Sequence, residues 1–313
     1  MMPDEPPAMR QPIVECIPNV SEGRDRRLIE RFADTIRSVA GVRLLDVHMD
    51  LDHHRSVFSF LGAPEAVESA ALALAAAVFP AIDMSAHRGA HPRIGALDVL
   101  PFVPLRGITM GEAVALARRA GQTLAERFDL PVYFYGEAAQ RPERRRLAEI
   151  RRGEYEGLGQ KLADPAWRPD AGPARFNPRS GATAVGARGI LVAFNVWLDT
   201  NDLEVARAIA GAVRESSRGL PGLQAMGVPL ASRGIVQVSM NLLDYRRTSI
   251  PRAFDRVRNE AAQRGIAVRQ SELVGLAPRD AFEERSPESV GLTDFAPEKL
   301  LQAHLPEEPP ARS

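Results

Sequence analysis

Residues 189–198 read GILVAFNVWL, a run of aliphatic and aromatic residues that follows a segment rich in Pro and Gly. Such a run, bounded by turn-forming residues, predicts a buried strand. The next predicted elements are helix, strand, strand, helix and strand, at 199–218, 223–230, 234–243, 251–264 and 266–276. The resulting order, β-α-β-β-α-β, is typical of the ferredoxin-like split unit.

The first half of the chain repeats this order. Its predicted elements are strand 13–18, helix 25–39, strands 42–49 and 55–61, helix 64–79 and strand 96–103. A helix at 111–128, a strand at 131–135 and a charged helix at 141–152 follow.

We therefore expect an α+β protein made of two related ferredoxin-like lobes, with mixed or antiparallel sheets covered by helices and a ligand cleft between them. The lobes would span 13–187 and 188–303, and the Pro- and Gly-rich segment 167–188 would connect them. The ends, 1–12 and 304–313, have the composition of disordered tails.

Charge and composition exclude several classes of protein. The 313 residues carry 40 basic and 40 acidic side chains, which argues against a general nucleic-acid binder. A single cysteine, Cys16, excludes an intrachain disulfide and a thiolate zinc cluster. The N-terminus has no signal-peptide pattern, and the longest apolar run, 70–82, is shorter than a membrane span. We expect a soluble, cytoplasmic protein with no nucleic-acid or membrane partner.

Five of the six histidines lie within one short part of the chain: His48, His53, His54, His87 and His91. The first three belong to DVHMDLDHHR, residues 46–55, which reads either as a metal or proton-shuttling cluster or as a polar hairpin tip. No recognised spacing such as His-Glu-x-x-His is present, so we predict no metal. We expect these three histidines to form a hairpin cluster separate from His87 and His91.

The other two histidines lie in SAHRGAHPRIGALD, residues 85–98. This is a polar loop that leads into a buried strand, and Pro92 restricts the backbone of His91 to extended conformations. Asp98 is a candidate to orient His91 or to bind substrate. From composition alone, a catalytic loop and a solvated loop are equally good readings.

Two further segments are candidates for ligand binding. PNVSEG, residues 18–23, offers anion-binding chemistry at a helix start, although an ordinary strand-to-helix turn with a cap is the favoured interpretation. GPARFNPRSGAT, residues 172–183, has arginines and Phe176 to hold a flat anionic ligand, or is a plain linker. The sequence has neither a Gly-x-Gly-x-x-Gly nor a Walker motif, and its 6% aromatic content disfavours an RNA-stacking platform.

Taken together, several motifs resemble the formiminotransferase domain family over about residues 13–275. They are VECIPNVSEG (14–23), LLDV (44–47), HRGAHPRIGALDVLPFVPLRG (87–107), PVYFYGEAA (131–139), GATAVGARGILVAFNV (181–196), NLLDY (241–245) and SELVGLAP (271–278). The resemblance implies transfer of a formimino group from N-formimino-L-glutamate to tetrahydrofolate, the acceptor co-substrate, in histidine degradation. The products would be 5-formimino-tetrahydrofolate and L-glutamate.

The family's catalytic histidine corresponds to His91, whose imidazole titrates near neutrality and suits general base and acid chemistry. The family's folate-binding segment corresponds to Gly172, Pro173, Ala174, Arg175, Phe176, Asn177, Pro178, Arg179, Ser180 and Gly181. Both substrates carry carboxylates, which arginines bind well. The further binding residues that we expect are Arg55, Arg93, Asp98, His48 and Asn19.

The chain departs from the animal members of this family at two positions. They have an acidic residue at the position of His48 and an aromatic residue at the position of Ser180, which leaves the donor substrate open. A related folate-dependent formyl or acyl transferase, a non-catalytic folate-binding protein, and a metal-dependent hydrolase built on His48, His53, His54 and His91 are the alternatives. We also expect a homodimer, from the family, and a separate cyclodeaminase acting downstream.

Overall fold

The computed structural model describes residues 11–293 and 295–305, and most of the two predicted tails lies outside these residues. The chain divides into two compact units, one ending at Arg188 and the other beginning at Gly189. Each unit has its own sheet and its own hydrophobic core.

The sheet of the first unit combines an antiparallel part with a parallel edge. Its strands are β1 (Ile13–Cys16), β2 (Asn19–Val20), β3 (Val42–Asp50), β4 (Arg55–Gly62), β5 (Leu97–Arg106), β6 (Val132–Gly136) and β7 (Thr183–Ala187). β1 and β2 both lie between β4 and β5, β3 pairs with the outer side of β4, and these pairings are antiparallel. β7 and then β6 extend the sheet beyond β5 in parallel.

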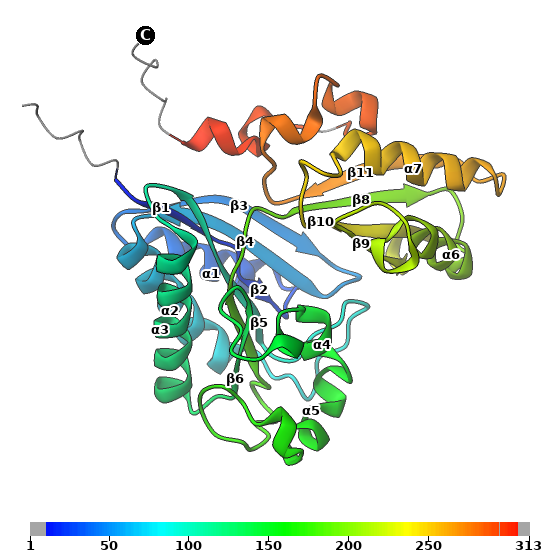
Figure 1. The fold of residues 1–313 in the computed structure, drawn as a ribbon. Helices are drawn as coiled ribbons and strands as arrows, with labels where there is room; N and C mark the ends of the chain where they lie inside the picture. Colours follow the sequence, from blue (N-terminus) through cyan, green and yellow to red (C-terminus); the bar gives the residue numbers. More distant parts are fainter. Residues whose placement is uncertain (1–10, 294, 306–313) are drawn as a thin grey trace, which may run out of the picture. The chain divides into compact units, whose positions relative to one another are not determined.

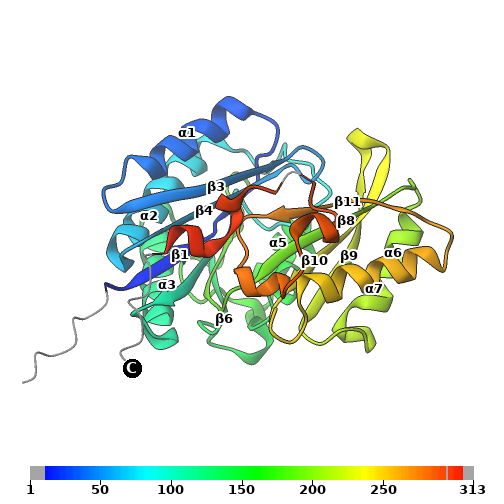
Figure 2. The same ribbon diagram turned by 90° about the horizontal axis from the view of Figure 1, so that it is seen from above.

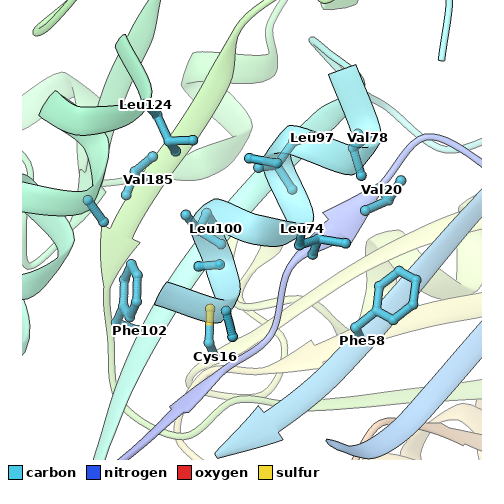
Figure 3. Packing of buried hydrophobic residues seen from close by; sticks show 14 of the residues in the cluster. Cys16, Val20, Phe58, Leu74, Val78, Leu97, Leu100, Phe102, Leu124 and Val185 are labelled. Atoms are coloured by element: carbon cyan, nitrogen blue, oxygen red, sulfur yellow. The ribbon is translucent and has the colours of Figure 1, made fainter. Parts of the chain in front are cut away.

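Three helices cover one face of this sheet: α1 (Arg26–Arg37), α2 (Pro64–Ala81) and α3 (Met110–Phe128) (Figure 1). The side chain of Asp25 caps α1, and Thr109 and Glu112 form a capping box at the start of α3. Among the described residues, α2 is the helix that is long and apolar enough to cross a membrane, by length and composition alone. It lies in the core instead, where Leu74 and Val78 pack beside Leu97 and Leu100 of β5 (Figure 3).

The opposite face of the sheet is covered near β5, β7 and β6 by α4 (Leu147–Arg151) and α5 (Glu154–Ala163). The prediction of one charged helix at 141–152 is only partly right. This segment forms a short 3-10 turn, Pro142–Arg144, followed by the single helical turn of α4. α5 was not predicted, because Gly157 and Gly159 interrupt the pattern of its buried residues Tyr155, Leu158 and Leu162.

The segment 167–188, predicted as a connector, includes a buried strand. Residues 183–187 form β7, which lies between β5 and β6, and every residue of this strand is buried. The hydroxyl of Thr183 donates a hydrogen bond of 2.6 Å to the carbonyl of Leu97. The small residues of TAVGA do not by themselves indicate a strand. The Pro and Gly residues before them are typical of a connector, which is why the whole segment was predicted as one.

The second unit has the predicted order β-α-β-β-α-β. Its elements are β8 (Val192–Leu198), α6 (Leu203–Val213), β9 (Leu223–Leu230), β10 (Ile235–Leu242), α7 (Ile250–Ala262) and β11 (Val268–Val274). The sheet is antiparallel, with strand order β11-β8-β10-β9. α6 and α7 lie side by side and bury their apolar residues against one face of it (Figure 2).

Removing one aromatic side chain from the first core should destabilise that unit. Phe102 on β5 is fully buried within the cluster of Figure 3. We expect Phe102→Ala to lower the free energy of unfolding by about 3–5 kcal/mol, from lost burial and the cavity that remains. Fluorescence of Trp167 during urea unfolding, in a Trp197→Phe background, reports the first unit alone. Leu51→Ala is the control, since that side chain is 51% exposed. Equal losses of unfolding free energy in the two variants would contradict the placement of Phe102 in the core.

Glu15 is a carboxylic acid that is buried on the other face of the same sheet. Val14 and Cys16 of β1 point into the helix-covered core, so Glu15 between them points to the opposite face, where it is 5% exposed. Burial raises the pKa of Glu15 to about 7, and the positive charge of Arg188 opposes this shift. The folded chain therefore favours the neutral acid.

This shift predicts a pH-dependent contribution to stability. A folded-state pKa above the ordinary 4.5 gives a contribution that is complete below pH 4.5 and is lost as the pH rises through 7. Between pH 5 and 8, Glu15→Gln should therefore gain stability relative to the parent chain, by up to about 3 kcal/mol. Urea unfolding at several pH values tests this, with Glu126→Gln, an exposed position, as control. A difference between Glu15→Gln and the parent that does not change with pH would refute it.

Candidate active site

His91 lies in the loop between α2 and β5, next to the first residue of β4. Arg55 begins β4, and its Nη1 lies 2.9 Å from Nε2 of His91 and 2.9 Å from Oδ1 of Asn19. Asn19 is in β2, which pairs with both β4 and β5. The sheet therefore brings together three of the predicted site residues.

Four histidines form two pairs, and each pair joins a histidine of the predicted hairpin cluster to a histidine of the His87–His91 loop. The rings of His53 and His91 have their centroids 5.5 Å apart, and those of His54 and His87 are stacked at 4.2 Å. Nε2 of His87 donates to the carbonyl of His54, at 2.9 Å. The prediction of two separate clusters is thus wrong for His53 and His54, because the turn before β4 folds against the His87–His91 loop.

Three of these four rings are held in the neutral form near pH 7. Burial, followed by the charges of Arg55 and Arg151, holds the pKa of His91 well below its usual value. Burial also lowers the pKa of His53 and of His87 to about 4 in each case, despite the opposing influence of Asp50 on His53. Neutral imidazoles that accept and donate hydrogen bonds therefore line the site.

Glu22, in the segment predicted as an anion site or a cap, orders the turn that precedes α1. Its carboxylate accepts hydrogen bonds from the backbone amides of Arg24 and Asp25, at 2.7 and 3.0 Å, and lies 3.3 Å from Nε2 of His54. Burial alone would raise the pKa of Glu22, but these hydrogen bonds lower it to about 2. A permanent anion at this place disfavours the binding of a further anion there.

Arg93 is a cross-link within the unit. Its buried guanidinium pairs with Glu156 of α5 through contacts of 2.6 and 2.7 Å, and with Glu154 at 3.1 Å. Its Nε also donates to Nδ1 of His87, at 3.2 Å. These hydrogen bonds from Arg93 lower the pKa of Glu156 to about 2. The carboxylates that Arg93 binds are thus the chain's own, and it fixes the His87–His91 loop to α5.

Asp98 has a similar internal role. The side chain, which is 2% exposed, accepts a hydrogen bond of 2.8 Å from the backbone amide of Ile94 and forms an ion pair with Arg151 of α4. Arg151 in turn acts on the charge state of His91. Asp98 therefore positions the loop that carries His91, and of its two predicted roles the structure favours orientation.

The segment 172–181 is joined directly to the His91 loop. Gly95 and Gly181 form an antiparallel bridge, and a Cβ added to Gly95 would lie 2.1 Å from the carbonyl oxygen of Ala182. Tyr155 also connects the two segments. Its side-chain hydroxyl donates a hydrogen bond to the carbonyl of Pro178, at 2.5 Å, and its backbone amide donates one to the carbonyl of Arg93, at 2.8 Å. Two glycines and one tyrosine thus hold the two predicted segments together.

The outward side of segment 172–181 carries an aromatic ring and two arginines. Phe176 is 38% exposed and lies on Tyr155, with ring centroids 5.4 Å apart. Arg179 donates to the carbonyl of Pro80, at 2.8 Å, and Arg175 pairs with Asp129, but both guanidinium groups remain largely exposed. The backbone is ordered from within, because Oδ1 of Asn177 accepts from the amides of Arg179 and Ser180.

A cavity of about 10 Å³ lies among these groups. It is lined by Ser21, His53, His54, Arg55, His87, His91, Arg93 and Asp98. A space of this size holds about one water molecule, whereas a small-molecule site needs some hundreds of Å³. His48, on β3 opposite Val57, is not among the lining residues. The cavity is therefore lined largely by ionisable side chains and has room for a water molecule but not for a substrate.

Comparison with known proteins connects this arrangement to a family. Residues 13–188 match the model of the formiminotransferase domain, N-terminal subdomain, and residues 193–286 match that of the formiminotransferase domain. The chain belongs to the formiminotransferase domain family. The resemblance inferred from the sequence motifs is thus confirmed.

Curated relatives cover nearly the whole chain. The glutamate formimidoyltransferase of Streptococcus pyogenes is 41% identical over 94% of this chain and 98% of its own length. That of Thermoplasma acidophilum is 44% identical over 94% and 97%. The formimidoyltransferase-cyclodeaminase of mouse is 45% identical over 86% of this chain but only 51% of its own length. The predicted class of enzyme, a formimidoyltransferase, is confirmed by these relatives.

Three residues that hold the His91 loop and segment 172–181 in place were not among the predicted site residues. They are Arg151 of α4 and Tyr155 and Glu156 of α5. Acidic residues in the first turn, Glu154 and Glu156, were the available signal for α5. Their contacts with Arg93 span about sixty residues of sequence, so no local pattern encodes them.

Removing the charge of Asp98 should disturb both stability and activity. Asp98→Asn leaves the mostly buried Arg151 without its carboxylate, and we expect a loss of about 3 kcal/mol in unfolding free energy. The turnover number should also fall, because the amide of Ile94 loses a charged acceptor. Urea unfolding and steady-state rates measure the two effects. Asp34→Asn, which breaks the exposed pair with Arg37, is the control; an equally small effect at Asp98 would contradict its positioning role.

Proposed function

We propose that the chain transfers the formimino group of N-formimino-L-glutamate to N5 of tetrahydrofolate, with His91 as the group that moves the proton. The observation that carries this proposal is the position of His91. Its ring contacts Arg55 and lines a cavity the size of one water molecule. The loop that carries it is joined to segment 172–181 by the bridge between Gly95 and Gly181.

The reaction requires one proton to change place. N5 of tetrahydrofolate attacks the formimino carbon and forms a C–N bond, and the C–N bond to the glutamate nitrogen then breaks. N5 must lose a proton and the departing nitrogen must gain one. A neutral imidazole can accept the first proton and return it to the leaving amine, so that the histidine ends as it began. The other ring nitrogens near His91 stay neutral and do not compete for this proton.

Segment 172–181 would hold the folate. Its exposed Phe176 offers a flat surface for the pteridine ring, and the exposed Arg175 and Arg179 suit the carboxylates of the folate tail. Arg55 is the arginine nearest to His91, so we assign it the carboxylate of formiminoglutamate. Arg93 and Asp98 support these groups from behind through their internal pairs. Asn19 orients Arg55, and a role for His48 in choosing the donor stays a prediction.

We further propose two ferredoxin-like domains, at 13–187 and 188–303. The strand order β3-β4-β1-β5 in the first unit parallels β9-β10-β8-β11 in the second, which supports this view. We also propose a homodimer, as the family suggests, a cytoplasmic location, and a separate cyclodeaminase that consumes the product.

A direct assay tests the proposed function. With formiminoglutamate and tetrahydrofolate, the parent chain should release glutamate, and His91→Ala should be slower by about 10²-fold or more. Tetrahydrofolate should still bind to the variant in a calorimetric titration. His304→Ala, which removes a histidine far along the chain in the last 3-10 turn, should keep full activity. An inactive parent chain would overturn the function, and a fully active His91→Ala would overturn the role of His91.

A further inference from the structure

Lys161 of α5 is one of the two lysines in the chain, and its ammonium group binds the backbone of the neighbouring helix. Nζ donates hydrogen bonds to the carbonyls of Glu149 at 3.2 Å, Ile150 at 2.6 Å and Arg152 at 2.8 Å. An ammonium group has three donors and no acceptor, so these three carbonyls use all of its donors. Lys161 therefore connects α5 to the end of α4 (Figure 1).

The three carbonyls lie at the end of α4 that needs donors from outside the helix. The last carbonyls of any helix have no partner within it, and α4 has only the five residues Leu147–Arg151. A helix of this length is marginal by itself, because helix formation is cooperative. Lys161 supplies both the donors and a positive charge, which is favourable at a helix C-terminus. The conformation of this turn therefore depends on Lys161 as well as on the burial of Ile150.

Lys161 is itself held by further contacts in the first unit. Its Nζ lies 4.1 Å from the centroid of the Trp167 ring. α5, which carries it, is anchored by its buried residues and by the pair of Glu156 with Arg93. Burial, followed by the charge of Arg152, lowers the pKa of Lys161 to about 8, so the ammonium form still predominates at pH 7.

Two of the bound carbonyls flank Arg151, the arginine that pairs with Asp98. In the described part of the chain, the buried Nε of Arg151 has no hydrogen-bond partner. Its guanidinium is therefore placed chiefly by the carboxylate of Asp98 and by the backbone of α4. Asp98 in turn accepts the amide of Ile94, at 2.8 Å, in the loop that carries His91. A shift at the end of α4 would thus be transmitted to this loop.

We propose that Lys161 is a positioning residue for the reaction at His91: its ammonium group fixes the C-terminal end of α4 and so sets the place of Arg151 against Asp98. This inference rests on the proposed function and adds to it a residue outside the site. Lys161 is not among the described residues that line the cavity beside His91, so it acts through α4 and not by contact.

The arrangement of the three carbonyls explains why a lysine is present here. The donors of an ammonium group point in three directions from one atom, whereas those of a guanidinium lie in one plane. Three carbonyls that converge on one nitrogen therefore fit lysine better than arginine. The chain has 40 basic residues, and all except Lys161 and Lys299 are arginine. Lysine thus stands at a position where the chain's usual cation would not satisfy the same three acceptors.

Removing the ammonium group should reduce turnover more than folate binding. Lys161→Met keeps the apolar stem, and its kcat should fall by about 10-fold, because small displacements of a catalytic group are costly. The KM for tetrahydrofolate should change by less than about 2-fold, since the bridge between Gly95 and Gly181 still holds segment 172–181. Lys299→Met removes the other lysine, which lies in the second unit, and as the control it should match the parent.

A double-mutant cycle separates positioning from general destabilisation. The charge of Arg151 lowers the pKa of His91, so Lys161→Met should raise this pKa by displacing Arg151. Arg151→Met should raise it as well, and in the double variant the two shifts should not add. NMR titration of the full chain, labelled with 15N in histidine, measures all three variants. Shifts that add, or an unchanged His91 titration in Lys161→Met, would overturn the inference.

Chemical rescue tests the ammonium group itself. Alkylation of Lys161→Cys with 2-bromoethylamine restores an ammonium group on a side chain of similar length, whereas bromoacetamide adds a neutral amide. Cys16 is buried and its thiol pKa is raised well above the usual value, so the introduced cysteine should react selectively. The amine adduct should recover kcat and the amide adduct should not. Because both adducts come from one folded variant, this comparison holds where Lys161→Met is too unstable, and equal activities would contradict the role of Lys161.

The two kinds of measurement distinguish this inference from the proposed function. If the parent chain is inactive with formiminoglutamate, but the His91 titration responds to Lys161→Met and not to Lys299→Met, the function fails and the positioning stands. If the parent is active and Lys161→Met keeps both its kcat and its His91 titration, the positioning fails and the function stands.

Discussion

The close approach of two backbones at Gly95 and Gly181 is the constraint on which the site depends. A Cβ on Gly181 would lie 2.1 Å from the carbonyl oxygen of Ile94, and Gly181 has φ +70°, so both space and backbone conformation require glycine. This bridge lies just before β5 and β7, two parallel neighbours in the sheet. The bridge places the loop of His91 beside segment 172–181, although the two are about eighty residues apart in the sequence.

The arginines around His91 differ in the groups that they bind. Arg93 and Arg151 are paired with carboxylates on α5 and β5 and so fix the loop, while burial and the charges of Arg55 and Arg151 hold the pKa of His91 well below its usual value. Arg55 contacts the amide oxygen of Asn19 and the imidazole of His91.

The sequence predicted most of the secondary structure, because buried strands and capped helices have local patterns. The second unit followed its predicted order, and Pro92, His91 and segment 172–181 could be singled out beforehand. β7 and α5 could not, since TAVGA consists of small residues and glycines interrupt the buried face of α5. The pairing of His53 with His91 and of Arg93 with Glu156 depends on the fold of the whole unit, so no spacing in the sequence indicates it.

In the proposed reaction, His91 and segment 172–181 form one site, in which the acceptor nitrogen of the folate meets the imidazole. A crystal structure of the chain with tetrahydrofolate and glutamate bound tests this most directly. We predict N5 within hydrogen-bonding reach of a ring nitrogen of His91, the pteridine against Phe176, and a glutamate carboxylate on Arg55. A folate bound away from segment 172–181, or with N5 turned away from His91, would contradict the account.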